Sequence, residues 1–554
     1  MAAPRGEVRV STEWSLARVY EIVCAAIPDR ELVVWGEVRE TYAQFATRAN
    51  ALAAYLDAQG MGAHRERAEL EPWECGQDRI AVLLHNRPEH LETVLACWQA
   101  RAVPCNVNYQ YTAAEIGDLL RMLGARGVVY ERALASKLDE VVDQLDVRIE
   151  IDDESDGPSL PDTVDYESVV QGGGTLALDA TTPDDLYIAC TGGTTGRPKA
   201  VLWRQGDLFV AGLGGTDDLD EAGIRARAER GGGVWFPTSP LMHVAAQWTA
   251  FLAAGMGATV VLHDDRARFD PVTILTTAAR ERANMMTIIG DAYARPLIEE
   301  LRRHPYDLSA LAVLGTGGTP TSAAAKDALA EQLPHATIRD GYGASEIGVL
   351  GSGEQSARVA QTQHFTVSPA ARILAEDRSH FLAPGDDEIG WMVRTGHVPL
   401  GYLNDEAATN ATFPTVDGAR VAIAGDRARY ADDGQVVLLG RDSLVVNTGG
   451  EKVFVEEVED VLKQHDAVVD ALVTGRPHER FGQEVVAIVQ LAVPDASAPA
   501  ELREWCTERL ARYKAPRAFV FVPEVRRHPS GKADYRWAKE RAVDAIEVVA
   551  GGPS

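Results

Sequence analysis

The stretch that decides the fold is LYIAC at residues 186–190 followed directly by TGGTTGRPK at residues 191–199. The short apolar run predicts a buried strand. In the loop after it, glycines let successive backbone amides point into one concavity that suits an anion, while Thr191, Thr194 and Thr195 add hydroxyl donors and Lys199 adds a cation. The Gly-Lys-Ser/Thr ending of a Walker A loop is absent. The segment therefore predicts a different kind of loop that binds a phosphate chain at the end of a strand.

On the N-terminal side of this loop, apolar runs alternate with helical patterns. Residues 79–84, 103–107 and 127–130 have the composition of buried strands, and residues 89–100 have that of a helix. Alternation of this kind predicts crossover units and a mostly parallel sheet. Ligands bind such sheets beyond the carboxyl ends of the strands, which is where the glycine-rich loop is expected.

Two polar segments and one apolar segment refine this picture. Residues 62–78 and the charged residues 217–233 are expected to be loops or insertions, and the second segment is a helix-prone arm that ends in three glycines. Residues 244–262 carry no charge, but Gly255 and Gly257 interrupt them. We therefore expect a buried helix, a tight turn and a buried strand at 258–262 in place of a membrane span.

A chain of 554 residues is too long for one hydrophobic core. The pattern changes near Arg441, after which an amphipathic helix, two strands and another helix are expected. The remaining stretch is long enough for a small domain. We predict an N-terminal domain at 1–440, a linker at 441–443 and a C-terminal domain at 444–554. The expected fold class is α/β, with a large N-terminal domain of mostly parallel sheets with helices and a small α+β C-terminal domain.

Charge and cysteine usage exclude several classes of protein. With 54 basic and 82 acidic residues the formal net charge is −28, which repels polyanions and argues against a nucleic-acid partner. The six cysteines are scattered without a CxxC pair, which argues against a zinc site or a disulfide scaffold. The first residues lack an apolar run of signal-peptide length. We expect a cytoplasmic protein without an integral membrane segment.

The segment TGGTTGRPKAV resembles the phosphate-loop signature of the adenylate-forming superfamily, which includes acyl-CoA synthetases, adenylation domains and luciferases. Five further segments resemble that family's signatures in the expected order: SPLMHVAAQW around His243, GTGGTP at 315–320, DGYGASE at 340–346, the Gly425-Asp426 and Gly440-Arg441 pairs, and PSGK at 529–532. The overall pattern is most similar to actinobacterial fatty-acid-CoA ligases, including those that act on steroid side chains.

This resemblance implies a two-step reaction and a mobile C-terminal domain. ATP and a carboxylic acid give an acyl-adenylate, and the acyl group then passes to coenzyme A, with Mg²⁺ expected alongside ATP. Between the two steps the C-terminal domain of the family rotates about a hinge, which corresponds here to Asp442 and Ser443. The family's pantetheine tunnel corresponds to Gly449, Gly450, Glu451 and Lys452.

The resemblance and the side-chain chemistry together suggest roles for the site residues. Lys532 would place a cation at the reacting α-phosphate, although a lysine in a glycine-containing turn is ordinarily a solvated surface group. Glu346 is a hard oxygen ligand suited to Mg²⁺. Tyr342 would stack on adenine. Arg441 would contact the ribose or brace the linker. His243 is either a packed core residue or a gate of the acyl pocket.

Among the nucleotide contacts, Asp340 would accept a hydrogen bond from the exocyclic amine of adenine, and Asp426 would accept from the ribose hydroxyls. The predicted catalytic residues are Lys532, Glu346 and His243, with Glu346 as the metal ligand. The predicted ATP and AMP contacts are Thr191, Gly192, Gly193, Thr194, Thr195, Gly196, Lys199, Gly317, Gly318, Thr319, Asp340, Gly341, Tyr342, Gly343, Ser345, Asp426, Arg441 and Lys532.

The candidate walls of the acyl pocket come from segments that match the family's pocket positions. They are Trp235, His243, Gln247, Trp248, Gly290, Asp291 and Val349. Small and apolar residues among them favour a sizeable hydrophobic acid, either a medium- to long-chain fatty acid or a steroid-derived acid.

Three other functions compete with a CoA ligase. An acyl-AMP ligase that loads a carrier protein often carries an insertion before the hinge, and residues 401–426 contain no long insertion. A luciferase-like oxygenase shares the motifs. A non-catalytic nucleotide-binding regulatory protein is disfavoured because such a protein need not keep Lys532.

Overall fold

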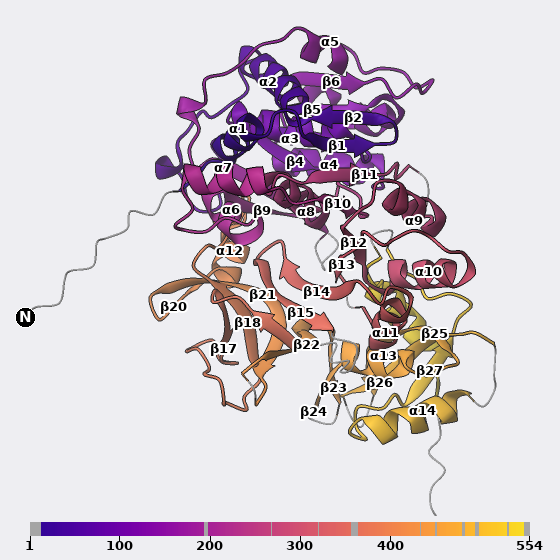
Figure 1. Ribbon diagram of the computed structural model, residues 1–554. Helices are drawn as coiled ribbons and strands as arrows, with labels where there is room; N and C mark the ends of the chain where they lie inside the picture. Colours follow the sequence, from indigo (N-terminus) through magenta and orange to yellow (C-terminus); the bar gives the residue numbers. More distant parts are fainter. Residues whose placement is uncertain are drawn as a thin grey trace, which may run out of the picture.

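The structure is a computed structural model that describes residues 13–192, 198–266, 269–319, 321–355, 364–432, 434–448, 451–478, 482–493, 498–528 and 531–547. Three sheets and the helices around them build the molecule (Figure 1). The helices are α1 (Leu16–Ala26), α2 (Tyr42–Ala58), α3 (Pro88–Gln99), α4 (Ala113–Leu123), α5 (Tyr166–Gln171), α6 (Gln205–Gly212), α7 (Glu221–Arg230), α8 (Val244–Gly255), α9 (Pro271–Arg280), α10 (Gly290–Arg303), α11 (Ala323–Gln332), α12 (Glu406–Thr412), α13 (Val455–Lys463), α14 (Ala498–Arg509) and α15 (Tyr535–Arg541).

The sheet that contains the glycine-rich loop has eight strands in the order β19-β9-β8-β4-β3-β5-β6-β7. From β8 to β7 all neighbours are parallel, as the alternating pattern predicted. The strands are β3 (Arg79–Leu83), β4 (Val103–Asn106), β5 (Gly127–Glu131), β6 (Val147–Ile151), β7 (Val164–Asp165), β8 (Leu186–Gly192), β9 (Pro198–Arg204) and β19 (Gly401–Tyr402).

The second sheet has fourteen strands, and one half of it is parallel except for the edge strand β2, which is antiparallel to β1. In that half, β11, β10, β12, β13 and β14 lie side by side and point the same way, so their carboxyl ends share one edge. The strands are β1 (Glu31–Trp35), β2 (Val38–Thr41), β10 (Val234–Pro237), β11 (Thr259–Leu262), β12 (Met285–Ile289), β13 (Val313–Gly317) and β14 (Thr337–Ala344).

The other half of this sheet is antiparallel, which the sequence analysis did not anticipate. Short connections join its strands, and α12 is the one helix among the described residues of this region, so the parallel crossovers seen elsewhere cannot form. The strands are β15 (Gly348–Gln355), β16 (His364–Val367), β17 (Ala371–Leu374), β18 (Gly390–Thr395), β20 (Thr415–Val416), β21 (Ala419–Tyr430) and β22 (Val436–Arg441).

A third sheet begins after Arg441, which ends β22, and a single 3₁₀ turn at Asp442–Leu444 connects the two. Its strands are β23 (Val445–Thr448), β24 (Glu451–Phe454), β25 (Val468–His478), β26 (Gly482–Leu491), β27 (Ala518–Phe521) and β28 (Ile546–Glu547). They enclose a core of their own with α13 and α14. The α/β fold class, with a large N-terminal and a small C-terminal domain, is therefore confirmed. The domain limits at 440 and 444 stay a prediction.

The expectations for the two polar segments and the uncharged segment can also be compared with the structure. Residues 62–78 contain one 3₁₀ turn at Arg67–Glu69 and are otherwise irregular, as expected. The charged, helix-prone segment 217–233 has α7 at its centre, as expected, and this helix packs against α1. The uncharged segment 244–262 forms α8 and β11. Among the described residues, the helices are all too short or too polar to cross a membrane.

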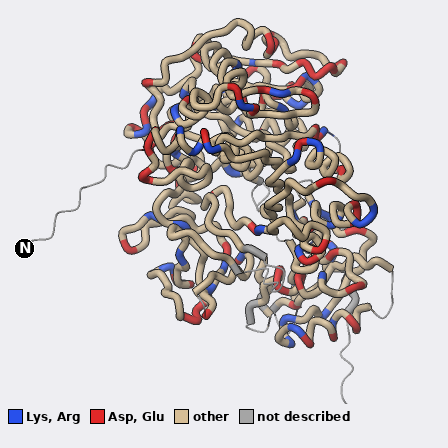
Figure 2. The backbone as a smooth tube through the Cα atoms, viewed as in Figure 1, with Lys and Arg blue, Asp and Glu red and all other residues tan. Residues whose placement is uncertain are grey.

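Figure 2 shows that acidic residues are distributed over both domains and interspersed with basic ones. The net charge of −28 is therefore spread along the chain and is not confined to one segment.

Candidate active site

The glycine-rich segment lies between two paired strands. β8 and β9 are antiparallel, and Thr191 stands opposite Lys199 in their register. Gly192 ends β8, whereas Gly193, Thr194, Thr195 and Gly196 lie outside the described residues. The hairpin thus brings a threonine and a lysine together at the base of the predicted phosphate loop.

Tyr402 connects Lys199 to Glu346. The ammonium of Lys199 lies 4.5 Å from the centre of the Tyr402 ring, a favourable cation–π contact. The Tyr402 hydroxyl donates a hydrogen bond to Glu346 Oε1 at 3.0 Å. Burial and the nearby Glu346 carboxylate raise the pKa of this phenol, so it stays protonated and remains a donor.

The sequence analysis missed Tyr402. Its position depends on β19 pairing with β9, with Tyr402 opposite Val201. Those residues are about two hundred positions apart along the chain, so no local pattern reveals the contact.

The predicted adenosine-binding residues meet around Asp426. Tyr342 donates its hydroxyl to Asp426 Oδ2 at 2.8 Å, and Arg441 Nε lies 3.5 Å from Asp426 Oδ1. Asp426 and Arg441 are also direct partners in the β21–β22 ladder. The Tyr342 ring centre lies 5.7 Å from that of Phe365. Three residues predicted from separate motifs thus form one cluster.

Asp340 has partners that the sequence analysis did not foresee. Lys326, on α11, and the Thr316 hydroxyl, on β13, donate to its two carboxylate oxygens. Both oxygens are therefore engaged, and an adenine amine would have to share one of them. Gly317, Gly318 and Thr319 follow on from Thr316 at the carboxyl end of β13.

Close backbone packing explains the glycines of the DGYGASE segment. A Cβ on Gly343 would lie 2.4 Å from the Gly348 carbonyl oxygen, and one on Gly317 would lie 3.3 Å from that of Gly341. The Trp203 indole donates to the Ser345 carbonyl at 2.8 Å. This part of the site is fixed by backbone contacts, so side chains larger than hydrogen are excluded at Gly343.

Lys532 comes to the site from the C-terminal domain. Gly531, before it, has φ +75°, and a Cβ there would lie 3.1 Å from Ile289 Cγ2 and 3.2 Å from Ala292 Cβ. The turn that carries Lys532 therefore packs on the junction of β12 and α10. Desolvation by the surrounding protein, followed by the positive charge of Arg441, lowers the pKa of the Lys532 ammonium, while Glu346 opposes this shift.

His243 lies close enough to Lys532 for its titration to be affected. Burial, and then the charge of Lys532, lowers the pKa of His243 to about 4, so the imidazole is neutral at pH 7. Among the described residues its buried Nε2 has no hydrogen-bond partner. A neutral imidazole with an unused nitrogen beside the lysine fits a wall of the reaction chamber.

Three predicted walls of the acyl pocket have partners in the core, and their role as pocket walls stays a prediction. Buried Gln247 accepts from the Tyr187 hydroxyl at 2.8 Å and donates to the Leu241 carbonyl at 2.9 Å. Trp248 packs edge-on against Trp203. The Trp235 indole turns back to the Gly232 carbonyl before β10, away from the strand end where His243 lies. Polar and aromatic residue types alone do not distinguish a pocket wall from a core partner.

The remaining predicted walls differ in exposure. Val349 is 52% exposed at the start of β15, as an open pocket wall would be. Gly290 opens α10 with φ +47°. Asp291 is buried, and it accepts from the Ser322 amide at 2.8 Å and from the Ser322 hydroxyl at 3.0 Å. These bonds tie α10 to α11.

The predicted hinge and CoA tunnel are described only in part. Asp442 Oδ1 lies 3.6 Å from Nε of the fully buried Arg427, which anchors the linker to β21. Ser443 belongs to the 3₁₀ turn. Gly449 and Gly450 lie outside the described residues, and Glu451 and Lys452 are described by their backbone in β24.

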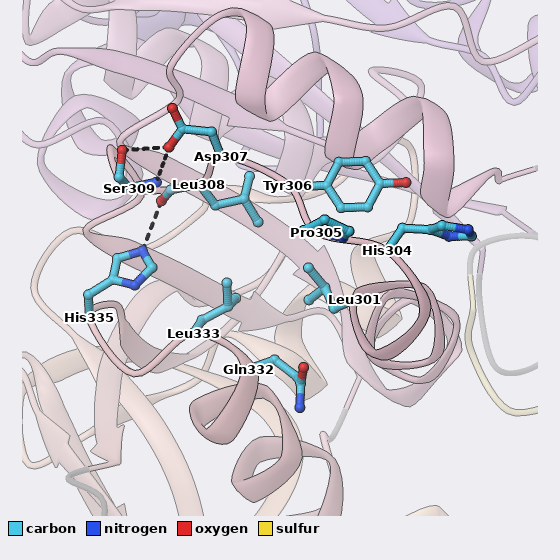
Figure 3. Close-up of a pocket in the computed structure, with 10 residues that line it drawn as sticks. All are labelled: Leu301, His304, Pro305, Tyr306, Asp307, Leu308, Ser309, Gln332, Leu333 and His335. Carbon is cyan, nitrogen blue, oxygen red and sulfur yellow. Dashed lines mark hydrogen bonds between the residues drawn. The ribbon is translucent and has the colours of Figure 1, made fainter.

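One cavity lies apart from this cluster. A pocket of about 440 Å³ lies between the carboxyl-terminal ends of α10 and α11, lined by residues such as Leu301, Tyr306, Leu333 and His335 (Figure 3). Those helices run back from the strand ends, so this pocket is at the opposite edge of the sheet from Tyr342 and Lys532.

The residues present fit a magnesium ion that accompanies ATP. Among the described residues no group of three or more His, Cys, Asp or Glu side chains could hold a metal by itself. Mg²⁺ bound through phosphates and water needs only one or two carboxylates. Glu346 uses Oε1 for Tyr402, which leaves a carboxylate oxygen for such an ion.

The chain is similar to known proteins over most of its length. The AMP-binding enzyme family matches residues 20–402, and the AMP-binding enzyme C-terminal domain matches residues 457–532. The medium-chain acyl-CoA ligase Mig of Mycobacterium avium is 43% identical over 96% of this chain and 99% of its own. The 3-oxocholest-4-en-26-oate–CoA ligase of Rhodococcus rhodochrous is 34% identical over 95% of this chain and 96% of its own.

Solved structures share the fold. The anthranilate CoA ligase AuaEII, in complex with anthranoyl-AMP, superposes with a TM-score of 0.80 at 18% identity over 96% of this chain and 98% of its own.

Proposed function

The chain belongs to the AMP-binding enzyme family, and from that premise we propose that it activates a medium- to long-chain or steroid-derived carboxylic acid. It is an AMP-forming acid–thiol ligase that uses a carboxylic acid, ATP and CoA. In the first step a carboxylate oxygen attacks the α-phosphorus and pyrophosphate leaves. In the second, the CoA thiol sulfur attacks the acyl carbon and AMP leaves. The six unpaired cysteines support the cytoplasm as its compartment.

One observation carries the site assignment: Lys199, Glu346 and Lys532 converge from three separate elements. Lys199 is held over Tyr402, Tyr402 bonds to Glu346, and Glu346 acts electrostatically on Lys532. The first step brings negative charges together at one phosphorus. Cations that are placed there in advance stabilise the transition state without further reorganisation.

The proposed division of labour follows from these positions. Lys199 binds the phosphate chain from the hairpin, and Asp426 with Arg441 holds the ribose. Lys532 stabilises charge at the α-phosphate and the leaving oxygen. When bound, Mg²⁺ would be held by Glu346 together with phosphate oxygens and would neutralise part of their charge. His243, neutral and partly buried, lines the chamber and limits the access of water.

The identity of the acyl group can be tested by measuring which acids the protein activates. We would incubate the protein with ATP, Mg²⁺ and single acids from acetate to octadecanoate, and with sterol side-chain acids. Each reaction would contain CoA or a holo-carrier protein, and products would be identified by mass spectrometry. We expect CoA thioesters of the larger hydrophobic acids. Equal turnover of acetate and the bulky acids would reject the large-pocket proposal, and acylation of the carrier alone would reject CoA as acceptor.

A further inference from the structure

Glu346 lies on a short turn whose backbone is anchored on one side by β9. The turn at residues 345–347 joins β14 to β15, which are paired antiparallel strands. The Trp203 indole of β9 donates to the Ser345 carbonyl at 2.8 Å. Ile347 is fully buried, and its amide donates to the Ala344 carbonyl at 3.1 Å. The residues before and after Glu346 are therefore held in place, while Glu346 itself is only partly buried.

Arg394 anchors the other side of this turn. It lies on β18, and its Nη1 donates to the Ile347 carbonyl at 2.9 Å and to the Val349 carbonyl at 3.0 Å. Its Nε donates to the His397 carbonyl at 2.7 Å. In the sheet, β18 is separated from β15 by β21, β22 and β16. The guanidinium therefore connects two segments that the strand ladder leaves unconnected.

Burial sets Arg394 apart from most arginines, because only 4% of the residue is exposed. Desolvation lowers the pKa of the guanidinium to about 10, and the Asp207 carboxylate opposes this shift, so Arg394 stays protonated at pH 7. A buried cation is tolerated only where its N–H groups have acceptors. The three described hydrogen bonds of Arg394 all go to backbone carbonyls, and two of these carbonyls follow Glu346. The bonds that offset the burial of this charge are thus the same bonds that hold the turn.

The same guanidinium also holds the segment that leads to Tyr402. After β18 the chain passes through His397, whose carbonyl accepts from Arg394, and continues into β19, which contains Tyr402. The Tyr402 hydroxyl donates to Glu346 Oε1 at 3.0 Å. Arg394 is therefore bonded both to the backbone after Glu346 and to the segment that carries the partner of the Glu346 side chain.

We propose that Arg394 is a positioning residue: by connecting the Glu346 turn to the segment before Tyr402, it fixes the Glu346 carboxylate in place at the phosphate chain of ATP. The inference rests on the proposed function, in which Glu346 holds Mg²⁺ together with phosphate oxygens. Arg394 acts through Glu346 and not by contact with the nucleotide. Loss of its bonds would let the turn move and would misalign the carboxylate. The contacts to the adenosine, which come from other residues, would remain.

The test compares how Mg²⁺ affects nucleotide binding in the wild type and in Arg394→Met, which keeps a long side chain but removes every donor. Binding of α,β-methylene-ATP would be measured by calorimetry with and without Mg²⁺, and binding of AMP, which lacks the outer phosphates, is the reference. We expect the Kd of the magnesium complex to rise about ten-fold, as is typical when a residue that orients a metal ligand is removed. The Kd values for AMP and for the metal-free analogue should equal those of the wild type.

Arg30→Met is the matched control. The Arg30 guanidinium also donates to three backbone carbonyls, those of Ala228, Gly257 and Glu229, at 2.7, 2.9 and 3.1 Å. None of these residues is a predicted site residue. Arg30→Met should therefore lower the Tm without changing the effect of Mg²⁺ on nucleotide binding.

A double-mutant cycle with Glu346→Gln tests whether Arg394 acts through Glu346. If it does, addition of Arg394→Met to Glu346→Gln should weaken binding of the magnesium complex no further. Arg394→Lys keeps the charge, but a single ammonium lacks the several donors of a guanidinium. This variant should give a Kd between those of the wild type and Arg394→Met.

Three outcomes would overturn the positioning proposal. They are a wild-type Kd for the magnesium complex in Arg394→Met, an equal loss of affinity for AMP, and full additivity with Glu346→Gln. If Arg394→Met fails to fold, Arg394→Lys decides the question, and a wild-type Kd for the magnesium complex in that variant would reject the proposal. Failure of the wild type to bind either AMP or the analogue would instead reject the proposed function.

Discussion

The two lysines of the proposed active site are held in opposite ways. Lys199 belongs to β9, stands opposite Thr191 in a hairpin and rests over the Tyr402 ring. Lys532 lies on a turn of another domain, and that turn packs on Ile289 and Ala292 through Gly531. We propose that the first cation is always present at the site, whereas the presence of the second depends on the orientation of the C-terminal domain. The first suits substrate binding, and the second suits a single chemical step.

Removal of Lys532 is the strongest test of this contrast. In Lys532→Ala we expect acid-dependent pyrophosphate release to fall by about 10²–10³-fold, the usual effect of deleting one preorganised charge donor. Thioester formation from supplied acyl-adenylate should persist, because pyrophosphate has already left. Both rates can be followed by quenched-flow with chromatographic separation. Normal adenylation by the variant would show that the lysine has no part in that step.

Removal of Lys199 should produce a smaller effect of a different kind. Lys199→Met keeps the apolar contact with Tyr402 and removes the charge. We expect the KM for ATP to rise about ten-fold while kcat changes less, because the contact with phosphate exists in both the ground state and the transition state. Initial rates of pyrophosphate release over a range of ATP concentrations would measure both. A loss confined to kcat would place Lys199 in the chemical step and remove the contrast with Lys532.

Features that depend on local sequence and features that depend on long-range contacts also differ in how far the sequence predicted them. The parallel strands follow from short apolar runs, which are local. The antiparallel half of the large sheet, Tyr402 and the Lys326–Asp340 pair depend on contacts between distant segments. A repeating pattern within a short stretch of sequence cannot predict contacts between segments that are far apart in the chain.

The predicted acyl pocket shows the same limit. Gln247 and Asp291 were assigned to pocket walls from the positions of family segments. In the structure both are buried and hydrogen-bonded to neighbouring elements. A polar residue in an apolar segment suits a pocket wall and a core partner equally well. Only the packing of the neighbouring helices and strands distinguishes the two.

The pH dependence of adenylation gives the smallest and most selective test. Lys532 must be protonated to stabilise phosphate charge, and desolvation together with Arg441 lowers its pKa below the ordinary lysine value. A lowered pKa means that the proton is lost at a lower pH. The rate of adenylation should therefore decline on the alkaline side before pH 10.5, the ordinary pKa of the group, with little change near neutrality. Thioester formation from supplied acyl-adenylate should lack this decline.

Lys532→Arg provides the control for that profile, because a guanidinium stays protonated throughout the accessible range. Any alkaline decline in the residual adenylation rate of this variant should also appear in the rate of the second half-reaction. If the decline persists in the arginine variant, another group titrates. Lys532 would then differ from Lys199 in its mobility but not in its protonation. The lowered pKa of Lys532 would no longer distinguish the two lysines.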